Sequence, residues 1–580
     1  TITEPGGTVT TFNYDATTKR LLNVVRGSTT MVTYTYDSIG RVRTETGTDG
    51  VTLTYDYDQL DQLRRVTYPD GTTETIDYVS VGLPGVITDR SGRKSYYDYD
   101  PLKRLVRVQD AQGSTLTYDL DAVGNLKRLT DSRGQHTRWT YDSLNRPLRK
   151  IYMDGSYDEF SYYQGLLAST RSTRGIVTSY GYDDNGNLTL INYPTSADVS
   201  FVPDALDRVQ SMTDGSGTTA WTYDILDRVK TEDGPLAADT VSYRYDALGR
   251  QDQLQINGGS TVSYAYDALE RLQTLTSPVG NFSYSYVGNS DLLQQLTMPN
   301  GTYTTYGYES AGTLKRLTLV ENRKSSTSLL SKYEYGYTST QNRDSRSFQK
   351  RTVGTGAMQQ INYGYNAVDE LTSEISTEAT PKLHKSYAYD RMGNRTALTD
   401  KSNLGTASLG NRTAYTPNAL NQIVQSVYTP ATGSATTTNY TFDFAGNLTQ
   451  TQNVGSSATT TYIYDDADRL TEILWKNSSG ANTQRSVFTY DGLSRKKKTQ
   501  EYSWSSGAWQ LDSTIQYVHD GLDIIQERNA SNAVTATLVR DGNIGGILAR
   551  TVSGANRYYH YDGSGNVVQV TKGDKTTMAE

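Results

Sequence analysis

A short phrase returns along this chain at a fixed interval. Tyr-Asp-Ala-Leu stands at residues 245–248 and again at residues 266–269, 21 positions later. The wider wording, Tyr-Asp-x-x-Gly followed by Arg or Asn, recurs along most of the 580 residues. Repetition of this kind is the signature of an architecture in which each unit buries its apolar face only by stacking on its neighbours. The chain must therefore fold from one small unit used many times.

Each unit contains a second turn with a different sequence motif. Glycines recur at intervals of 21 residues between the Tyr-Asp phrases, at Gly50, Gly71, Gly92, Gly113, Gly134 and Gly155. The segments between the two turns alternate in polarity, as in "TLTYD" and "TRWTYD", which is typical of β-strands. The pattern predicts one β-hairpin per unit, with strands of about 6 residues and turns of about 4.

The residue pattern of the Tyr-Asp turn has a physical reason. The Asp carboxylate can cap the turn, and the Gly, Asn or Asp three residues later tolerates a positive φ angle. The Tyr ring and the Leu or Val that opens the next strand can pack on neighbouring hairpins, while the Arg reaches water or the Asp. We expect structural roles for Tyr36, Asp37, Gly40, Arg41, Tyr99, Asp100, Tyr141, Asp142, Tyr182, Asp183, Tyr223, Asp224, Tyr245, Asp246, Gly249, Arg250, Tyr266, Asp267, Tyr389, Asp390, Tyr464, Asp465, Tyr490, Asp491, Tyr561 and Asp562.

The period loosens after about residue 310. The tyrosines Tyr308, Tyr337, Tyr365 and Tyr389 follow one another at 29, 28 and 24 residues, with insertions that we interpret as longer hairpins or loops. No Pro- or Ser-rich linker separates the two halves. We expect a single β unit over residues 1–580, regular over 1–310 and irregular over 311–580.

Composition excludes several classes of protein. The 56 Lys and Arg against 63 Asp and Glu give a net charge of −7, which argues against a nucleic-acid-binding surface. There is no Cys, so disulfides and thiolate chemistry are excluded, and no apolar run of about 18 residues could span a bilayer. Tyrosine occurs 47 times against 8 Phe, which favours thin layers with a wet face over a dry core.

The recurring Tyr-Asp-x-x-Gly-Arg/Asn-Leu resembles the YD repeats of the Rhs family, which includes bacterial polymorphic toxins, the C components of insecticidal toxin complexes and teneurins. The resemblance covers essentially the whole chain. It implies an all-β fold in which a continuous, spiralling antiparallel sheet of hairpins forms a hollow, cocoon-like shell. In toxin members that shell encloses a polypeptide cargo or toxin, and a second shell chain or a plug completes it.

Rhs toxins carry a further core after the repeats, with Asp-Pro and Pro-x-Gly elements and an aspartate-dependent self-cleavage. This sequence stops soon after the phrase at Tyr561, so we expect the core and the toxin to be absent and the chain to be a truncation.

Three features invite a functional reading beside a structural one. The four histidines, His136, His384, His519 and His560, show no metal-ligand spacing, so we interpret them as wall or surface residues rather than as part of a catalytic constellation.

"DDNGN", beginning at Asp183, resembles the start of a calcium loop, but it lacks the later Glu and coincides with the repeat's own turn. Trp504 and Trp509 flank "SSGA" and either pack across a hairpin or stack on a sugar ring as a weak ligand contact.

The sequence therefore predicts a non-enzymatic encapsulating shell, secreted or displayed on the surface of a bacterium, with no catalytic, cofactor or metal site. The alternative is a teneurin-like adhesion or carbohydrate-binding module that presents the insertions between about residues 320 and 440 and the Trp hairpin. A hydrolase hidden in the irregular half is a third reading, which no nucleophile motif supports.

Overall fold

The structure is a computed structural model that describes residues 1–4, 7–310, 313–337, 346–353, 356–376, 383–402, 409–541 and 546–578. This part of the chain contains no helix, and its strands form one 51-stranded sheet. Each strand pairs antiparallel with the next strand in the sequence, from the β1–β2 pair to the β50–β51 pair.

The strands of the first half are short and evenly spaced. They are β1 (Ile2–Thr3), β2 (Val9–Tyr14), β3 (Leu21–Arg26), β4 (Thr29–Tyr36), β5 (Val42–Gly47), β6 (Thr52–Tyr57), β7 (Leu63–Thr67), β8 (Thr73–Ser80), β9 (Leu83–Thr88), β10 (Lys94–Tyr99), β11 (Leu105–Gln109), β12 (Thr115–Leu120) and β13 (Leu126–Thr130). There follow β14 (His136–Tyr141), β15 (Pro147–Ile151), β16 (Tyr157–Tyr163), β17 (Leu166–Arg171), β18 (Val177–Tyr182), β19 (Leu188–Asn192), β20 (Val199–Pro203), β21 (Val209–Asp214), β22 (Gly217–Tyr223), β23 (Val229–Asp233), β24 (Val241–Tyr245), β25 (Gln251–Ile256) and β26 (Ser260–Tyr266).

Later strands include longer members. They are β27 (Leu272–Ser277), β28 (Gly280–Tyr286), β29 (Leu293–Thr297), β30 (Tyr303–Tyr308), β31 (Leu317–Ser325), β32 (Ser328–Tyr337), β33 (Arg346–Val353), β34 (Gln359–Tyr365), β35 (Leu371–Ser376), β36 (His384–Tyr389), β37 (Arg395–Asp400), β38 (Asn411–Pro417) and β39 (Ile423–Thr429). The last are β40 (Thr436–Phe442), β41 (Leu448–Asn453), β42 (Thr459–Tyr464), β43 (Leu470–Lys476), β44 (Asn482–Tyr490), β45 (Lys496–Ser505), β46 (Ala508–Asp520), β47 (Asp523–Arg528), β48 (Val534–Arg540), β49 (Ile547–Val552), β50 (Ala555–Tyr561) and β51 (Val567–Lys572).

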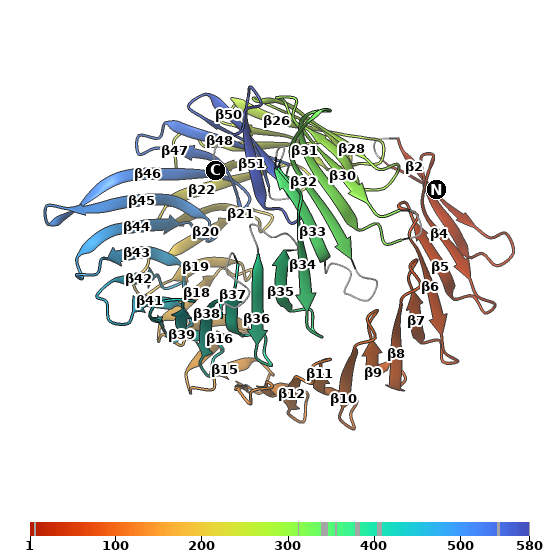
Figure 1. Cartoon of the computed structure of the whole chain (residues 1–580), viewed down its shortest axis with the longest axis horizontal. Helices are drawn as coiled ribbons and strands as arrows, with labels where there is room; N and C mark the ends of the chain where they lie inside the picture. The colour runs from red at the N-terminus through yellow and green to blue at the C-terminus, as the bar shows by residue number, and fades with distance from the viewer. Residues whose placement is uncertain are drawn as a thin grey trace.

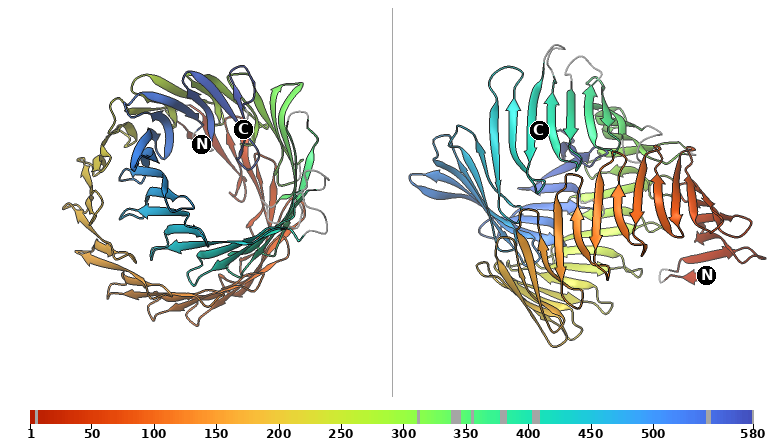
Figure 2. Two further views of the ribbon diagram at one scale, coloured as in Figure 1. Left: turned by 60° about the vertical axis from the view of Figure 1, so that its left-hand side comes forward. Right: turned by 90° about the horizontal axis from the view of Figure 1, so that it is seen from below.

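The sheet coils into a spiral, so that strands far apart in the sequence lie side by side (Figures 1 and 2). Hydrogen bonds between successive windings join residues about 270 positions apart, such as Asp214 with Gly492 and Asn300 with Thr571. The view in the left panel of Figure 2 shows the ribbon wound as a ring. The fold class expected from the sequence, a spiralling antiparallel sheet that forms a hollow shell, is confirmed.

The wall is one sheet thick in its first third and two sheets thick near the chain's end. Among the described residues, every buried apolar side chain lies within residues 199–361 or 517–558. The largest cluster packs β27–β29 against β48–β50, with Leu275 and Phe282 fully buried. Two further clusters pack β24 and β25 on β46 and β47, and β31 on β32. The C-terminal strands thus cover a face of the first winding.

Candidate functional site: the YD turns and the seam between windings

The Asp of each Tyr-Asp phrase caps its own turn. In the first regular unit, Asp37 Oδ1 accepts hydrogen bonds from the amides of Gly40 at 2.8 Å and Arg41 at 2.9 Å. Arg41 Nε then donates to Asp37 Oδ2 at 2.7 Å. The same carboxylate–guanidinium pair forms in the turns Asp100–Arg104, Asp142–Arg146, Asp204–Arg208, Asp224–Arg228, Asp246–Arg250, Asp267–Arg271, Asp465–Arg469 and Asp491–Arg495. One aspartate therefore satisfies both the turn amides and the arginine that starts the next strand.

These hydrogen bonds lower the pKa of two of the caps. Desolvation would raise the pKa of Asp37, but the hydrogen bonds from Arg41 and from the turn amides outweigh it and lower that pKa to about 2. The hydrogen bond from the Arg208 side chain likewise lowers the pKa of Asp204. Asp37 and Asp204 therefore stay ionised at a lower pH than an ordinary aspartate.

The fourth turn residue adopts a left-handed backbone conformation. Gly40 and Gly249 have φ angles of 102° and 83°, as the sequence pattern predicts. Lys103 and Glu270 also occupy this position, with φ angles of 65° and 67°, although neither residue type was expected there. A non-glycine residue there costs about 1 kcal/mol of strain, so side-chain contacts have to compensate.

The Tyr of the phrase fastens each hairpin to the one before it. The hydroxyl of Tyr36 donates to the Leu21 carbonyl oxygen at 2.6 Å, and that of Tyr141 donates to the Leu126 carbonyl oxygen at 2.9 Å. Equivalent bonds are made by Tyr78, Tyr99, Tyr162, Tyr182, Tyr223, Tyr245, Tyr266, Tyr286, Tyr308, Tyr337, Tyr389, Tyr464, Tyr490 and Tyr561. Phenylalanine cannot make this bond, which gives one physical reason for the excess of Tyr over Phe.

The turn arginine also binds the next turn along the same edge of the sheet. Arg41 Nη1 donates to the Asp58 carbonyl oxygen at 2.9 Å and to Asp61 Oδ1 at 2.8 Å. Its guanidinium carbon lies 4.7 Å from the centre of the Tyr57 ring. Arg104, Arg208, Arg271 and Arg469 reach the following turn in the same way. Sequence reasoning assigned this arginine only to water or its own aspartate and missed the link between turns.

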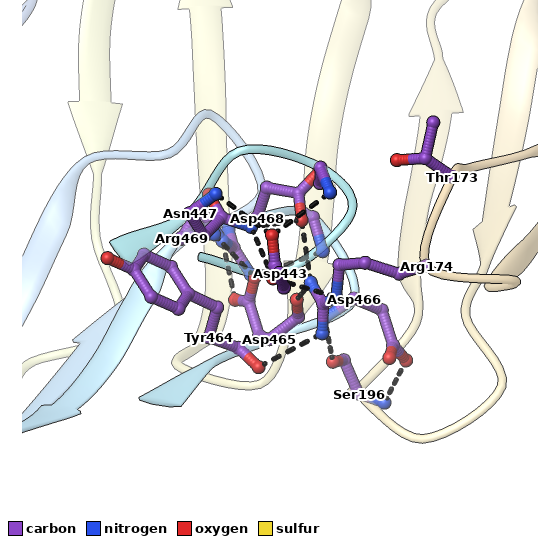
Figure 3. A network of polar contacts seen from close by, with 12 residues as sticks. Thr173, Arg174, Ser196, Asp443, Asn447, Tyr464, Asp465, Asp466, Asp468 and Arg469 are labelled. Atoms are coloured by element: carbon purple, nitrogen blue, oxygen red, sulfur yellow. Dashed lines mark hydrogen bonds and ion pairs between the residues drawn. The ribbon is translucent and has the colours of Figure 1, made fainter. Parts of the chain in front are cut away.

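The two windings meet along a seam where the other edge of the sheet, which carries the glycine turns, lies against the Tyr-Asp turns of the next winding. Arg174, between β17 and β18, enters this seam (Figure 3). Its Nη1 donates to the Asp465 carbonyl oxygen at 2.7 Å and to Asp468 Oδ1 at 2.6 Å, and its Nε lies 3.5 Å from Asp443 Oδ2. Beside it, Asp466 accepts the Ser196 amide at 2.7 Å.

Arg133 enters the seam two repeats earlier and contacts the equivalent positions of another turn. Its Nη1 donates to Asn421 Oδ1 at 2.6 Å and its Nη2 donates to the Asn418 carbonyl oxygen at 3.2 Å. Arg93 forms a bidentate pair with Asp369, at 2.7 and 2.8 Å. Arginines from one winding therefore hold the turns of the next.

The seam becomes a buried ion cluster where the wall thickens. Arg495 Nη1 lies 2.7 Å from Glu232 of the first winding, and Arg495 Nε donates to Asp491 Oδ2 at 2.7 Å. The Asp491 side chain is fully buried and that of Arg495 is 3% exposed. Desolvation acts to lower the pKa of Arg495, but Glu232 and Asp491 raise it, so the guanidinium stays charged.

The structure places the remaining candidates as follows. Asp183 accepts the amides of Asn185 and Asn187, and Oδ2 accepts the Asn187 side chain, as in an Asx-capped turn. Trp504 and Trp509 face each other across the β45–β46 hairpin, with ring centroids 5.0 Å apart and an interplanar angle of 74°.

The histidines divide between two environments. His519 and His560 are 3% and 0% exposed, whereas His136 and His384 are half-buried. Desolvation lowers the pKa of His560 to about 4, and desolvation together with Lys497 and Arg495 lowers that of His519 to about 3. Among the described residues, no three His, Asp or Glu side chains are grouped to hold a metal ion.

A cavity of about 860 Å³ lies where the second layer begins. Its lining combines tyrosines, including Tyr264 and Tyr284, with the carboxylates Asp520 and Asp523. Asp520 accepts the Tyr243 hydroxyl at 3.0 Å, and Asp523 lies 3.0 Å from Arg540, so both carboxylates already have partners.

Comparison with known sequences identifies the repeat. The family model described as teneurin YD-shell matches residues 84–220, and the RHS repeat model matches residues 36–73. No curated protein matches the chain in a sequence search. These matches confirm the resemblance to YD-repeat and Rhs proteins, and the fold they accompany is a β-shell built from that repeat.

Solved toxin-complex structures share the fold. The crystal structure of TcdB2-TccC3 superposes with a TM-score of 0.75 at 15% identity, over 98% of this chain and 34% of that chain. The structure of the Photorhabdus luminescens Tc holotoxin pore gives 0.71 at 15% identity, over 97% of this chain and 33% of that chain. The crystal structure of TcdB2-TccC3-Cdc42 gives 0.67 at 16% identity, over 98% and 33%. This chain thus spans about a third of the length of the chains it matches.

The part of the chain that the structure describes includes no helix long and apolar enough to cross a membrane.

Proposed function

We propose that this chain is a non-enzymatic shell that encloses a polypeptide cargo and keeps it from folding, from its targets and from proteases. The observation that carries the proposal is the spiral wall itself, in which successive windings are joined by arginine contacts at the seam. The likeness of nearly the whole chain to toxin-complex chains supports it. A wall of hydrogen-bonded strands offers a protease few accessible segments, because cleavage requires local opening of the backbone.

We also propose that the shell is secreted or displayed on a bacterial surface and that residues 1–580 form one YD-repeat unit. The resemblance to Rhs proteins supports these proposals.

Electron microscopy of the purified chain tests the shape. We expect a particle with an enclosed interior. A solid rod or a flat sheet would contradict the shell and favour the adhesion reading.

Protease protection tests the enclosure. We would fuse an unfolded reporter peptide after Glu580 and compare its digestion in the parent chain and in the Arg133→Ala/Arg174→Ala variant. The reporter should be protected in the parent and digested faster when the seam is weakened. Arg107→Ala is the matched control, because Arg107 pairs with Asp98 on an exposed face away from the seam. Enclosure would be refuted if the reporter fused to the parent chain were digested as fast as the reporter fused to the seam variant.

One observation favours a second function, recognition of a surface glycan. The β45–β46 hairpin extends outward at the edge of the molecule (Figure 1), and Trp504 near its tip is 37% exposed. An exposed indole can stack on a sugar ring. A glycan array that stays blank for the parent chain would leave Trp504 and Trp509 as a packing pair.

A further inference from the structure

The fifth residue of the Tyr-Asp turn decides how a turn is linked to its neighbours. Where it is Arg, as at Arg41, one guanidinium contacts three acceptors: the Asp of its own turn, and the first carbonyl oxygen and fourth side chain of the following turn. Where it is Asn, as at Asn447, the shorter side chain binds its own Asp443 and Asp468 of the following turn, at 3.0 and 2.9 Å. It leaves the carbonyl oxygen of that turn without a guanidinium.

Arg174 supplies the missing guanidinium from the other winding. Its three acceptors are Asp443 Oδ2, the Asp465 carbonyl oxygen and Asp468 Oδ1, which correspond one by one to the three acceptors of Arg41.

Arg133 repeats the arrangement at Asn394. It lies 3.6 Å from Asp390 Oδ2 and binds the Asn418 carbonyl oxygen and Asn421 Oδ1. Asn394 donates to the same Asn421 oxygen at 3.0 Å. By contrast, the seam turn whose fifth residue is Arg495 meets Glu232, an acid, from the neighbouring winding.

The first winding has two turns of the Asn kind on its free edge. Asn125 donates to Asn145 Oδ1 at 2.9 Å, and Asn187 donates to Asp207 Oδ1 at 2.8 Å. These contacts match those of Asn394 and Asn447. Within the described part of the chain, no arginine from another winding reaches either site, and Asn145 and Asp207 are exposed.

Apolar side chains mark the same edge. The third turn residue is more than 60% exposed in this row of turns, at Ile39, Leu60, Leu102, Val123, Leu144 and Leu206. At the seam the equivalent Met392 and Leu420 are partly covered and line a cavity of about 600 Å³ together with Met153 and Thr173 of the first winding. An exposed apolar row bordered by polar groups is typical of an interaction surface.

We propose that Asn at the fifth turn position marks a receptor for an arginine side chain from an adjacent turn edge. The receptors at Asn125 and Asn187 then bind arginine-tipped hairpin turns of a separate polypeptide, which covers the exposed apolar row as the first winding covers Leu420. This inference concerns the edge of the sheet and holds whether or not the interior encloses cargo.

A second copy of this chain does not fit as that partner. The arginine turns Arg133 and Arg174 are already occupied at the seam of each copy. In three described turns on the glycine-turn edge of the second winding, the residues in the position of Arg133 are Ser479, Ser531 and Asp574. The last two of these turns already contact the first winding, at Ala237 and Gly301. The partner must bring its own arginines.

One substitution made at two places tests the rule within the chain. Asn125→Arg should raise the melting temperature or leave it unchanged, because the new side chain can fill the vacant acceptors as Arg104 does one turn earlier. Asn447→Arg should lower it, because the new guanidinium competes with Arg174 for Asp468. Adding Arg174→Ala to Asn447→Arg should recover the loss. The rule is refuted if Asn447→Arg is as neutral as Asn125→Arg, or if removing Arg174 deepens the loss.

Binding of a hairpin probe tests the free edge. The probe is a cyclised peptide of residues 126–141, which carries Arg133 at its tip, and its control is the same peptide with Arg133→Ala. We expect the arginine peptide to bind the full chain about tenfold more tightly than its control, and Asn125→Arg combined with Asn187→Arg to abolish that difference. Equal binding of the two peptides, or a difference that survives both substitutions, would overturn the proposal.

Discussion

The single-layer wall of β4–β19 and the double-layer wall of β24–β32 with β46–β51 use the same repeat and are held together in different ways. In the single layer, side chains are half-exposed on both faces and the turns carry the fastening: Asp caps, Tyr hydroxyls and Arg links. In the double layer, Leu275, Phe282 and Val320 are fully buried and a conventional core forms. The comparison shows that the repeat specifies how neighbouring strands pair. The thickness of the wall depends on whether a second winding of the spiral lies over the first.

The largest expected difference is between the turn aspartates of the two walls, which make the same contacts at different depths. Asp491→Ala should cost about 4 kcal/mol of unfolding free energy, because the buried Arg495 loses one of its two carboxylate partners. Asp142→Ala, in the single layer, should cost about 1 kcal/mol, because Arg146 can be solvated. Urea unfolding of both variants measures this, and equal losses would show that burial does not distinguish the two walls.

A smaller difference is expected for aliphatic side chains. Leu275→Ala should cost about 3 kcal/mol because it opens a cavity in a closed core. Leu129→Ala should cost about 1 kcal/mol, because Leu129 is only half-buried in a wall with one layer. A Leu129→Ala variant that unfolds as readily as Leu275→Ala would imply that the single layer has a hidden core.

Acid should weaken the two walls in sequence. The pKa values of His560 and His519 are lowered to about 4 and about 3, so the unfolded chain binds protons first as pH falls below 6.5 and the double layer loses stability. The Asp37 cap, with its pKa lowered to about 2, contributes stability above pH 3.8 and loses it only as pH falls toward 2. Hydrogen exchange, corrected for intrinsic rates, should show residues 517–541 and 546–560 opening at higher pH than residues 30–60. The reverse order would contradict the role given to the two histidines. In a His519→Gln/His560→Gln variant, the double layer should no longer lose stability between pH 6.5 and 4.

The smallest expected effect separates tyrosine's ring from its hydroxyl. Tyr141→Phe should cost about 1 kcal/mol, because it removes the bond to the Leu126 carbonyl oxygen. Tyr96→Phe is the control, since Tyr96 is 42% exposed and its ring lies on the wall surface. Urea unfolding that does not distinguish the two variants would assign the tyrosine bias to packing alone.

The turns and strands could be predicted from the sequence because their causes are local. The hydrogen bonds that close the turn join Asp37, Gly40 and Arg41, which lie within five residues, and the alternation of "TLTYD" predicts the strands. The link from Arg41 to Asp61 spans one repeat. It could have been suspected because Asp61, the fourth residue of its turn, is a polar residue where the repeat often has Gly. Lys103 and Glu270 show that this position tolerates residues that the turn rule excludes.

The seam and the second layer could not be predicted, because they join residues about 270 positions apart. The local sequences "SRG" and "TRG" do not predict that Arg133 and Arg174 contact turns of the next winding. The buried clusters left a weak trace in the aliphatic segment around Ile524 and Ile525, which departs from the polar alternation of the earlier strands. The expected boundary at residue 310 and the assignment of single repeat residues to structural roles stay predictions.

The strictly consecutive pairing of the strands sets an order in which the molecule can assemble. Each ladder contact joins residues within about one repeat, so its loop-closure entropy is small and hairpins can add one after another as the chain leaves the ribosome. The seam closes only after a full winding of some 270 residues exists, and the core at Leu275 must wait for residues near 548. We expect chains arrested before residue 360 to have protected ladder amides but an accessible Arg174, which pulse-labelling of arginine would detect. Synthesis thus leaves the wall open while anything lying inside can still be placed there.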